Sequence, residues 1–143
     1  MSMQTLPNFK IVILDDNEFY SKILSRFLKE SLNKMSIVKG FTVDIFSFTS
    51  YTDCIKKLDN SIDILFTDYY LSDGYNASNI IDFINEKLFK CKVVVVSQIK
   101  NIQTSVVTAL AGAYEFIKKD ENTLYECNGI AETIISERLG LTN

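Results

Sequence analysis

Three short, largely apolar runs constrain the fold of this chain more than any other feature of its sequence. They cover residues 10–14, 62–67 and 92–97, and each stops abruptly at a polar residue. The last of them, Lys92-Val-Val-Val-Val-Ser97, is β-branched throughout its interior. Runs of this length without polar alternation are typical of parallel strands that are covered on both faces. They therefore predict a sheet with helices packed on either side.

Segments with helical spacing separate these predicted strands. From Asn17 onward apolar residues recur at helical spacing, and Asp16 or Asn17 can serve as the N-cap. We expect a linker over residues 33–40 after this helix. Further helices are expected over residues 50–58, 78–89, 101–111 and 123–139, and further strands over residues 41–48 and 114–117.

Local signals refine two of the helices. In the segment 78–89 the spacing predicts an inner face made of Ile80, Ile81, Ile84 and Leu88. Thr123 and Glu126 have the spacing of a capping box at the start of the last helix. The resulting order, βαβαβαβαβα with short links, predicts parallel strands and right-handed crossovers. The chain is thus expected to be one α/β domain with a doubly wound, five-stranded parallel sheet.

Composition excludes several classes of function. The 143 residues suit a single domain, and the formal net charge of −3 argues against a nucleic-acid-binding surface. The absence of histidine removes histidine-based triads, metal sites and general bases. Cys54, Cys91 and Cys127 have no metal-binding or disulfide spacing, so we expect small core or half-buried residues in a reducing compartment. Without a signal core or membrane-length segment, we expect a soluble cytoplasmic protein that contacts no membrane.

Chemically useful side chains follow most of the predicted strands. Asp15-Asp16 follows the first strand, Asp68 the third, Ser97 ends the fourth and Lys118-Lys119 follows the fifth. The carboxyl ends of parallel strands share one edge of the sheet, where carboxylates repel one another unless a cation joins them. Oxygen ligands without histidine or cysteine favour Mg²⁺. With a lysine and a hydroxyl nearby, such a site suits phosphoryl transfer to a carboxylate. Taken singly, each of these residues is more often a cap, a strand terminator or a surface charge.

Together, these residues match a known pattern. The pattern consists of Asp15-Asp16, Asp68 with Leu71 and Asp73-Gly74 after it, Ser97 after Val93–Val96, and Gly112-Ala113-x-x-Phe116-x-x-Lys119. In this order the sequence resembles a response-regulator receiver domain, the chemotaxis-regulator type of flavodoxin-like fold. The resemblance covers about residues 9–139, with residues 1–8 as a leader and residues 140–143 as a tail.

The resemblance implies a role for each residue. Asp68 would accept a phosphoryl group from a phosphohistidine on a sensor histidine kinase or a histidine phosphotransfer domain. Mg²⁺ would be held by Asp68, by Asp16 directly, by Asp15 largely through water, and by the backbone carbonyl of Tyr70. Ser97 and Lys119 would contact phosphoryl oxygens, with Lys119 favoured over Lys118 by its spacing from Phe116. Phe116 would be the switch aromatic that turns inward when Ser97 moves.

The function implied is that of a stand-alone receiver without an output domain. It would catalyse its own phosphorylation and dephosphorylation, use no organic cofactor and turn over no separate substrate. Phosphorylation would shift a two-state equilibrium and change binding to a downstream effector protein through the face formed by residues 101–139. The chain would be a monomer or a weak homodimer and would bind no nucleic acid itself. The alternative is a degenerate receiver that acts as a phosphorylation-independent interaction module.

The sequence also departs from the family pattern. Asp120 stands where the family usually has proline after the lysine, with a cis peptide before it, and Ser72 replaces another usual proline. Tyr70 and Gln98 are bulky for their positions, and we expect them to crowd the hydrolytic water and prolong the life of the phosphorylated form.

Two enzyme-like alternatives fit the residues less well. A haloacid-dehalogenase-type enzyme needs a second aspartate two residues after the nucleophile, where this chain has Tyr70. A flavodoxin-like flavin binder needs a Ser/Thr/Gly-rich phosphate cradle after the first strand, which this sequence lacks.

Overall fold

A five-stranded parallel sheet forms the centre of the molecule. The computed structural model describes residues 5–98 and 102–141. The strands run in the order β2-β1-β3-β4-β5, and every neighbouring pair is parallel. Their bounds are β1 (Asn8–Leu14), β2 (Thr42–Phe48), β3 (Ile64–Thr67), β4 (Lys92–Ser97) and β5 (Glu115–Lys118). The doubly wound α/β fold predicted from the sequence is confirmed.

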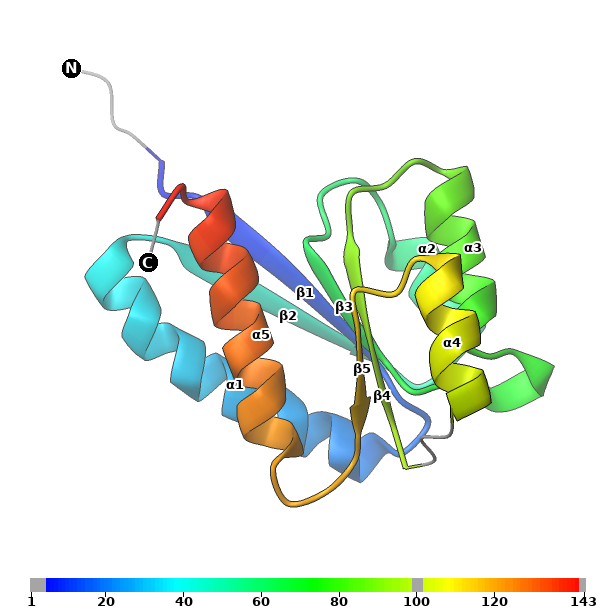
Figure 1. Ribbon diagram of the computed structural model, residues 1–143. Helices are drawn as coiled ribbons and strands as arrows, with labels where there is room; N and C mark the ends of the chain where they lie inside the picture. The colour runs from blue at the N-terminus through cyan, green and yellow to red at the C-terminus, as the bar shows by residue number, and fades with distance from the viewer. Residues whose placement is uncertain (1–4, 99–101, 142–143) are drawn as a thin grey trace.

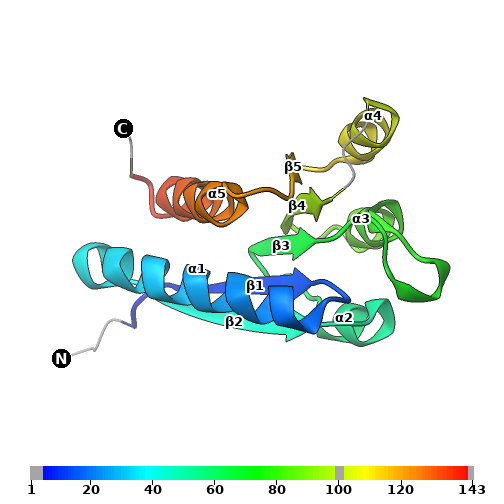
Figure 2. The same cartoon turned by 90° about the horizontal axis from the view of Figure 1, so that it is seen from below.

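Helices cover both faces of this sheet. They are α1 (Glu18–Lys39), α2 (Tyr51–Lys57), α3 (Ala77–Glu86), α4 (Ile102–Ala111) and α5 (Thr123–Arg138), with a 3₁₀ turn at Ser72–Gly74. Helices α1 and α5 lie side by side on one face, and α2, α3 and α4 lie on the other (Figures 1 and 2). No helix within the described ranges is both long enough and apolar enough to span a membrane.

Each face of the sheet has its own core, which explains the continuous apolar runs. Alternate residues of β1 point to opposite faces, so Ile11 and Ile13 join one core while Val12 and Leu14 join the other. The first core includes Leu24, Leu28 and Leu32 from α1 and Cys127, Ala131, Ile134 and Ile135 from α5. The second includes Cys54 from α2 and Ile80, Ile81 and Ile84 from α3.

The predicted linker over residues 33–40 is wrong, because α1 continues through it to Lys39. Leu28, Leu32 and Met35 extend the inward stripe of this helix at spacings of four and three residues. The helix ends at Gly40, whose φ of 77° is left-handed and whose N–H bonds to the carbonyl of Ser36 at 2.9 Å. Gly40 is therefore the residue at which α1 ends.

The predicted inward position of Leu88 is also wrong. Helix α3 ends at Glu86, and Leu88 has a φ of 58° and is 87% exposed. Its side chain therefore leaves the inner face on which Ile80, Ile81 and Ile84 are buried.

The predicted capping box at the start of α5 is not formed. Thr123 is already the first residue of the helix, and its N-cap, Asn122, makes no side-chain capping bond. The Thr123 hydroxyl instead accepts a hydrogen bond from the Asp120 N–H at 2.7 Å and donates to the Lys118 carbonyl at 3.2 Å. These bonds fix the turn between β5 and α5, on which Lys119 lies.

The ends of the chain were predicted less sharply. Asn8 belongs to β1 rather than to the leader, and residues 1–4 of that leader lie outside the described residues. The same holds for Asn101, which was predicted to begin the fourth helix, and for residues 142–143 of the tail.

Candidate functional site

A cavity of about 270 Å³ opens at the carboxyl edge of the sheet. It lies where β1, β3, β4 and β5 end, as expected for an open α/β sheet. Its lining consists of Asp15, Asp16, Asn17, Asp68, Tyr70, Ser97, Gln98 and Lys119. Apart from Asn17, all of them were predicted from the sequence to belong to the site. They come from four separate segments of the chain.

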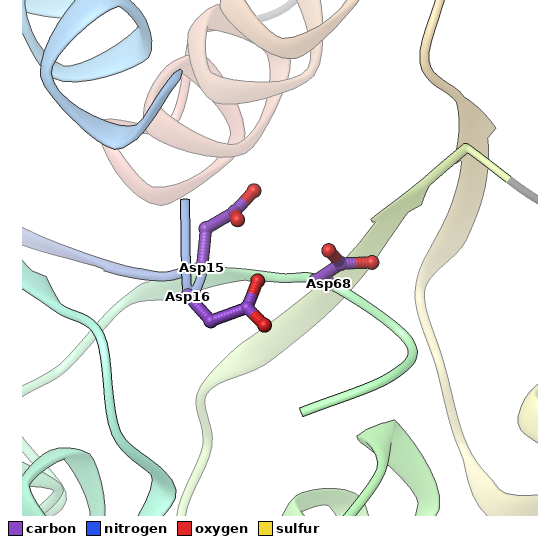
Figure 3. Close-up of side chains that lie close together, drawn as sticks. All are labelled: Asp15, Asp16 and Asp68. Atoms are coloured by element: carbon purple, nitrogen blue, oxygen red, sulfur yellow. The ribbon is translucent and has the colours of Figure 1, made fainter. Parts of the chain in front are cut away.

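Three carboxylates converge in this cavity. Asp15 and Asp16 directly follow β1, and Asp68 directly follows β3, as Figure 3 shows. The two strand ends are joined by a hydrogen bond from the Asp68 N–H to the Leu14 carbonyl at 2.9 Å. One oxygen of each carboxylate lies within 4.8 Å of the others. Asp15 is buried, Asp68 half-buried and Asp16 exposed, so the cluster opens to solvent on one side.

Asp68 is held in place by a backbone donor and a cation. The Tyr69 N–H donates to Asp68 Oδ1 at 2.8 Å, and Lys119 Nζ lies 3.4 Å from Oδ2. Burial raises the pKa of the Asp68 carboxyl, Lys119 counteracts this increase, and the nearby Asp15 charge adds to it. The anionic form of Asp68 is thus less stable here than in water, which favours the approach of a further positive charge.

Lys119 supplies the positive charge already present in the cavity. Its Nζ forms a 2.7 Å ion pair with Asp15 Oδ2, and its backbone N–H donates to the Ser97 carbonyl at 2.8 Å. Lys118 belongs to β5 and is exposed to solvent. The structure therefore places Lys119, rather than Lys118, among the carboxylates.

Tyr20, the third residue of α1, is a further neighbour of the site. Lys119 Nζ lies 4.3 Å from the centroid of its ring. Burial raises the pKa of the Tyr20 phenol to about 12, so the ring remains neutral near pH 7. The only signal in the sequence was its position one helical turn after Asp16, which does not distinguish a site residue from a core residue.

Asp120, which stands in place of the usual proline, does not enter the cavity. Its Oδ1 accepts a hydrogen bond from the Asn122 N–H at 2.8 Å within the β5–α5 turn. The described residues contain no cis peptide bond, so the Lys119–Asp120 bond is trans. The extra carboxylate thus caps a turn, and the ammonium of Lys119 remains paired with Asp15 and Asp68.

The predicted switch and tuning residues occupy different positions. Ser97 is buried at the end of β4, while Gln98 and Tyr70 are exposed at the mouth of the cavity. Phe116 is half-buried on β5, with its ring centroid 6.5 Å from that of Tyr69. It does not line the cavity but contacts the residue that follows Asp68, so the structure leaves its predicted role as a switch untested.

The residues present fit a hard divalent cation. The donors are carboxylate oxygens, the set that Mg²⁺ prefers, and they are close enough to share one ion. Burial, and to a lesser extent the Asp15 charge, raises the pKa of Asp68, and such an ion would stabilise the anionic carboxylates against both effects. Asp15 already accepts bonds at both oxygens, from the Asn17 N–H at 2.9 Å and from Lys119. Asp68 likewise accepts bonds at both oxygens, from the Tyr69 N–H and from Lys119, so the exposed Asp16 has the most room for direct coordination.

Comparison with solved structures shows which fold this is. The chain is similar to the BeF₃-activated receiver domain of DrrB, with a TM-score of 0.72, 18% identity, and coverage of 90% of this chain and 97% of that one. It is similar to a CheY-like receiver domain protein from Methanospirillum hungatei JF-1, with a TM-score of 0.71, 19% identity, and coverage of 91% and 96%. A two-component response regulator from Clostridium difficile gives a TM-score of 0.69 at 23% identity, over 89% of this chain and 95% of that one.

The chain resembles these receiver domains in structure more than in sequence. No protein-family model matches the chain, and no curated protein matches it. At these identities the comparison establishes the fold, and the chain has the flavodoxin-like fold of response-regulator receiver domains.

Proposed function

We propose that this chain accepts a phosphoryl group on Asp68 and uses the resulting change in structure to control protein binding. The observation that carries the proposal is the placement of Asp68 within 4.8 Å of two further carboxylates and 3.4 Å from Lys119. A structural ion pair needs one acid and one base. Here three acids face one lysine around an open cavity, which suits a nucleophile that receives charged ligands.

The proposed reaction is transfer from a phosphohistidine of a sensor histidine kinase or a histidine phosphotransfer domain. An Asp68 carboxylate oxygen attacks phosphorus and forms a P–O bond. The bond from phosphorus to the imidazole nitrogen breaks, and that nitrogen keeps the electron pair. The product is an acyl phosphate on Asp68. The Tyr69 N–H, which donates to Asp68 Oδ1, orients the carboxylate for this attack.

The other residues of the cavity stabilise the transferred group. Mg²⁺, held by Asp16, Asp68 and the Tyr70 carbonyl, with Asp15 acting largely through water, would neutralise charge on the phosphoryl oxygens. Lys119 contacts the same oxygens through its ammonium, which is already beside Asp68. Ser97, at the end of β4, provides a hydroxyl at the opposite wall. A phosphoryl group that attracts Ser97 on β4 would couple the site to Phe116 on the neighbouring strand β5.

The proposed output surface is the face formed by α4, β5 and α5. Val106 and Val107 on α4 and Tyr114 before β5 are exposed apolar or aromatic side chains. A broad groove of about 640 Å³, lined in part by Tyr114, follows β5 and α5. Exposed apolar and aromatic side chains favour contact with a protein partner, and Phe116, which lines this groove, lies near Tyr69, the residue that follows Asp68.

Intact mass after incubation with acetyl phosphate and Mg²⁺ tests the proposal. We expect one added phosphoryl group in the wild-type chain. Asp68→Asn should give none, because it removes the nucleophile without changing the shape of the side chain. Asp73→Asn is the matched control, since Asp73 is exposed in the following loop and should leave labelling unchanged.

Two further results would contradict the proposal. Labelling that persists in Asp68→Asn would assign the acceptor to another residue. Absence of both labelling and Mg²⁺ binding would favour the alternative function, an interaction module that works without phosphorylation. Titration of the metal-free chain with Mg²⁺ by calorimetry separates this alternative from a slow acceptor, because a slow acceptor still binds the ion.

A further inference from the structure

The ammonium of Lys119 lies among two carboxylates and an aromatic ring. Nζ is 2.7 Å from Asp15 Oδ2, 3.4 Å from Asp68 Oδ2 and 4.3 Å from the centroid of Tyr20. The Lys119 side chain is only 9% exposed, so water contributes little to the solvation of this charge. Under these conditions a cation–π contact is stronger than on an open surface.

The ring of Tyr20 is held in this position by the start of α1. Tyr20 is the third residue of the helix, and its N–H donates to the Asn17 side chain at 3.0 Å. Its hydroxyl is buried near Thr123, the first residue of α5. A side chain whose tip is buried has little freedom to turn away from the ammonium.

A divalent cation would change the balance of forces on Lys119. Asp15 and Asp68 are partners of the ammonium and also two of the carboxylates that converge for metal binding. A cation among them repels the ammonium and competes for their oxygens. The Tyr20 ring is neutral and is no ligand for a hard ion, so its attraction for Lys119 is not reduced in this way.

We propose that Tyr20 is a positioning residue whose ring keeps the Lys119 ammonium beside Asp68 while a divalent cation occupies the carboxylates. This inference rests on the proposed function, in which Lys119 must contact phosphoryl oxygens when Mg²⁺ is already bound. Among the contacts of the ammonium within the described residues, the one with the ring involves no oxygen for which the cation competes.

Nuclear magnetic resonance of ¹³C-lysine-labelled protein tests the contact directly. Methylene protons above an aromatic face shift upfield, and the Lys119 signal is assigned by its loss in Lys119→Met. We expect its ε-methylene protons to be shifted upfield in the wild type and in Tyr20→Phe, and to remain so when Mg²⁺ is saturating. In Tyr20→Leu the shift should be absent. A wild-type signal that moves to the position of the other lysines on addition of Mg²⁺ would overturn the proposal.

The rate of labelling by acetyl phosphate at saturating Mg²⁺ tests the consequence. We expect Tyr20→Leu to be about tenfold slower, the effect of a partly buried cation–π contact, and Tyr20→Phe to be within twofold of the wild type. Phe27→Leu is the matched control, because Phe27 is a half-buried aromatic of α1 that packs on Tyr125 away from the cavity. Equal rates in Tyr20→Leu and the wild type would overturn the proposal. If the wild type takes up no phosphoryl group, the proposed function fails, whereas the lysine signal still tests the Tyr20 contact.

Discussion

Each of the two edges of the sheet carries a buried aspartate that forms an ion pair with a basic side chain, but the surroundings of the two pairs differ. At the amino edge, Asp63 precedes β3 and forms an ion pair with Arg138, the last residue of α5. Asp63 also accepts the Lys10 N–H at 2.9 Å, and Arg138 donates to the Lys90 carbonyl at 3.1 Å. One acid there faces one base. At the carboxyl edge three acids face Lys119 around a cavity.

This difference separates a structural ion pair from a candidate reaction site. Asp63 is the single acid of its pair, and its oxygens accept from the Lys10 N–H and from Arg138, so its charge is compensated by its own partners. The carboxyl-edge cluster has three carboxylates around one ammonium, and burial together with the Asp15 charge raises the pKa of Asp68 despite the presence of Lys119. Burial and ion pairing alone therefore do not mark function. An excess of carboxylates over basic groups beside a cavity does indicate a candidate functional site. Substitutions at each edge of the sheet test this statement.

The largest expected effect on stability is at the amino edge. Arg138→Met leaves the Asp63 charge without its partner and should lower the free energy of unfolding by about 3 kcal/mol. Urea denaturation measures this loss, and the rate of labelling by acetyl phosphate should be unchanged in the folded variant. Lys22→Met, which breaks the exposed pair with Glu18, is the control and should cost less than about 0.5 kcal/mol. A loss in Arg138→Met no larger than in this control would contradict a structural role.

Removing the Lys119 ammonium at the carboxyl edge should change metal binding and phosphorylation. Lys119→Met should bind Mg²⁺ more tightly, because the ammonium no longer competes for Asp15 and Asp68. Labelling by acetyl phosphate should nevertheless fall about a hundredfold, the usual effect of losing one charged donor to a transition state. Calorimetry and intact mass measure the two quantities. Lys118→Met is the matched control, and similar behaviour of the two variants would contradict the assignment of Lys119.

The comparison of the edges also shows what the sequence could and could not predict. Asp15, Asp68, Ser97 and Lys119 were predictable because each follows a short apolar strand, and parallel strands bring their carboxyl ends together. The Arg138–Asp63 pair and the Lys119–Tyr20 contact join residues distant in the chain, and no local pattern marks them. They arise from how α5 and α1 pack on the sheet, which depends on the complete fold.

The errors in the predicted elements have a similar origin. The polar residues around Asn33 suggested a linker, but the burial of Leu32 and the packing of Met35 against the sheet continue the helix. The Thr123 hydroxyl bonds to the Asp120 N–H and the Lys118 carbonyl, in the turn and strand before the helix, instead of forming the capping box. In each place a contact outside the predicted pattern determined the local structure.

A smaller effect is expected when the excess charge is reduced at Asp68. In chelated, metal-free protein, Asp68→Asn should raise the free energy of unfolding at pH 7 by about 1 kcal/mol. The folded state raises the pKa of this carboxyl, so its ionisation destabilises the fold increasingly as the pH rises through the folded-state pKa. Below the unfolded-state pKa of about 4 both states are protonated, and the advantage of Asn should vanish.

Urea denaturation at pH 7 and at about pH 3.5 measures this difference. Asp73→Asn is isosteric and exposed, so it should show no comparable pH-dependent gain. An Asp68→Asn variant that is less stable than the wild type at pH 7 would mean that the pairing with Lys119 outweighs burial. The carboxyl edge would then resemble the amino edge in its energetics.

The smallest expected effect concerns access of water to the carboxyl edge. Tyr70 and Gln98 are exposed and line the cavity, and we expect them to crowd the approach of water to Asp68. Tyr70→Asn with Gln98→Ala should shorten the lifetime of the acyl phosphate about fivefold, because a smaller rim admits the hydrolytic water more readily. Decay of the phosphorylated mass at fixed Mg²⁺ measures the lifetime. Tyr75→Asn is the control, since Tyr75 is in the same loop but stacks on Tyr51 outside the cavity. An unchanged lifetime in the double variant would contradict this prediction. It would show that water reaches Asp68 equally well with or without the Tyr70 and Gln98 side chains.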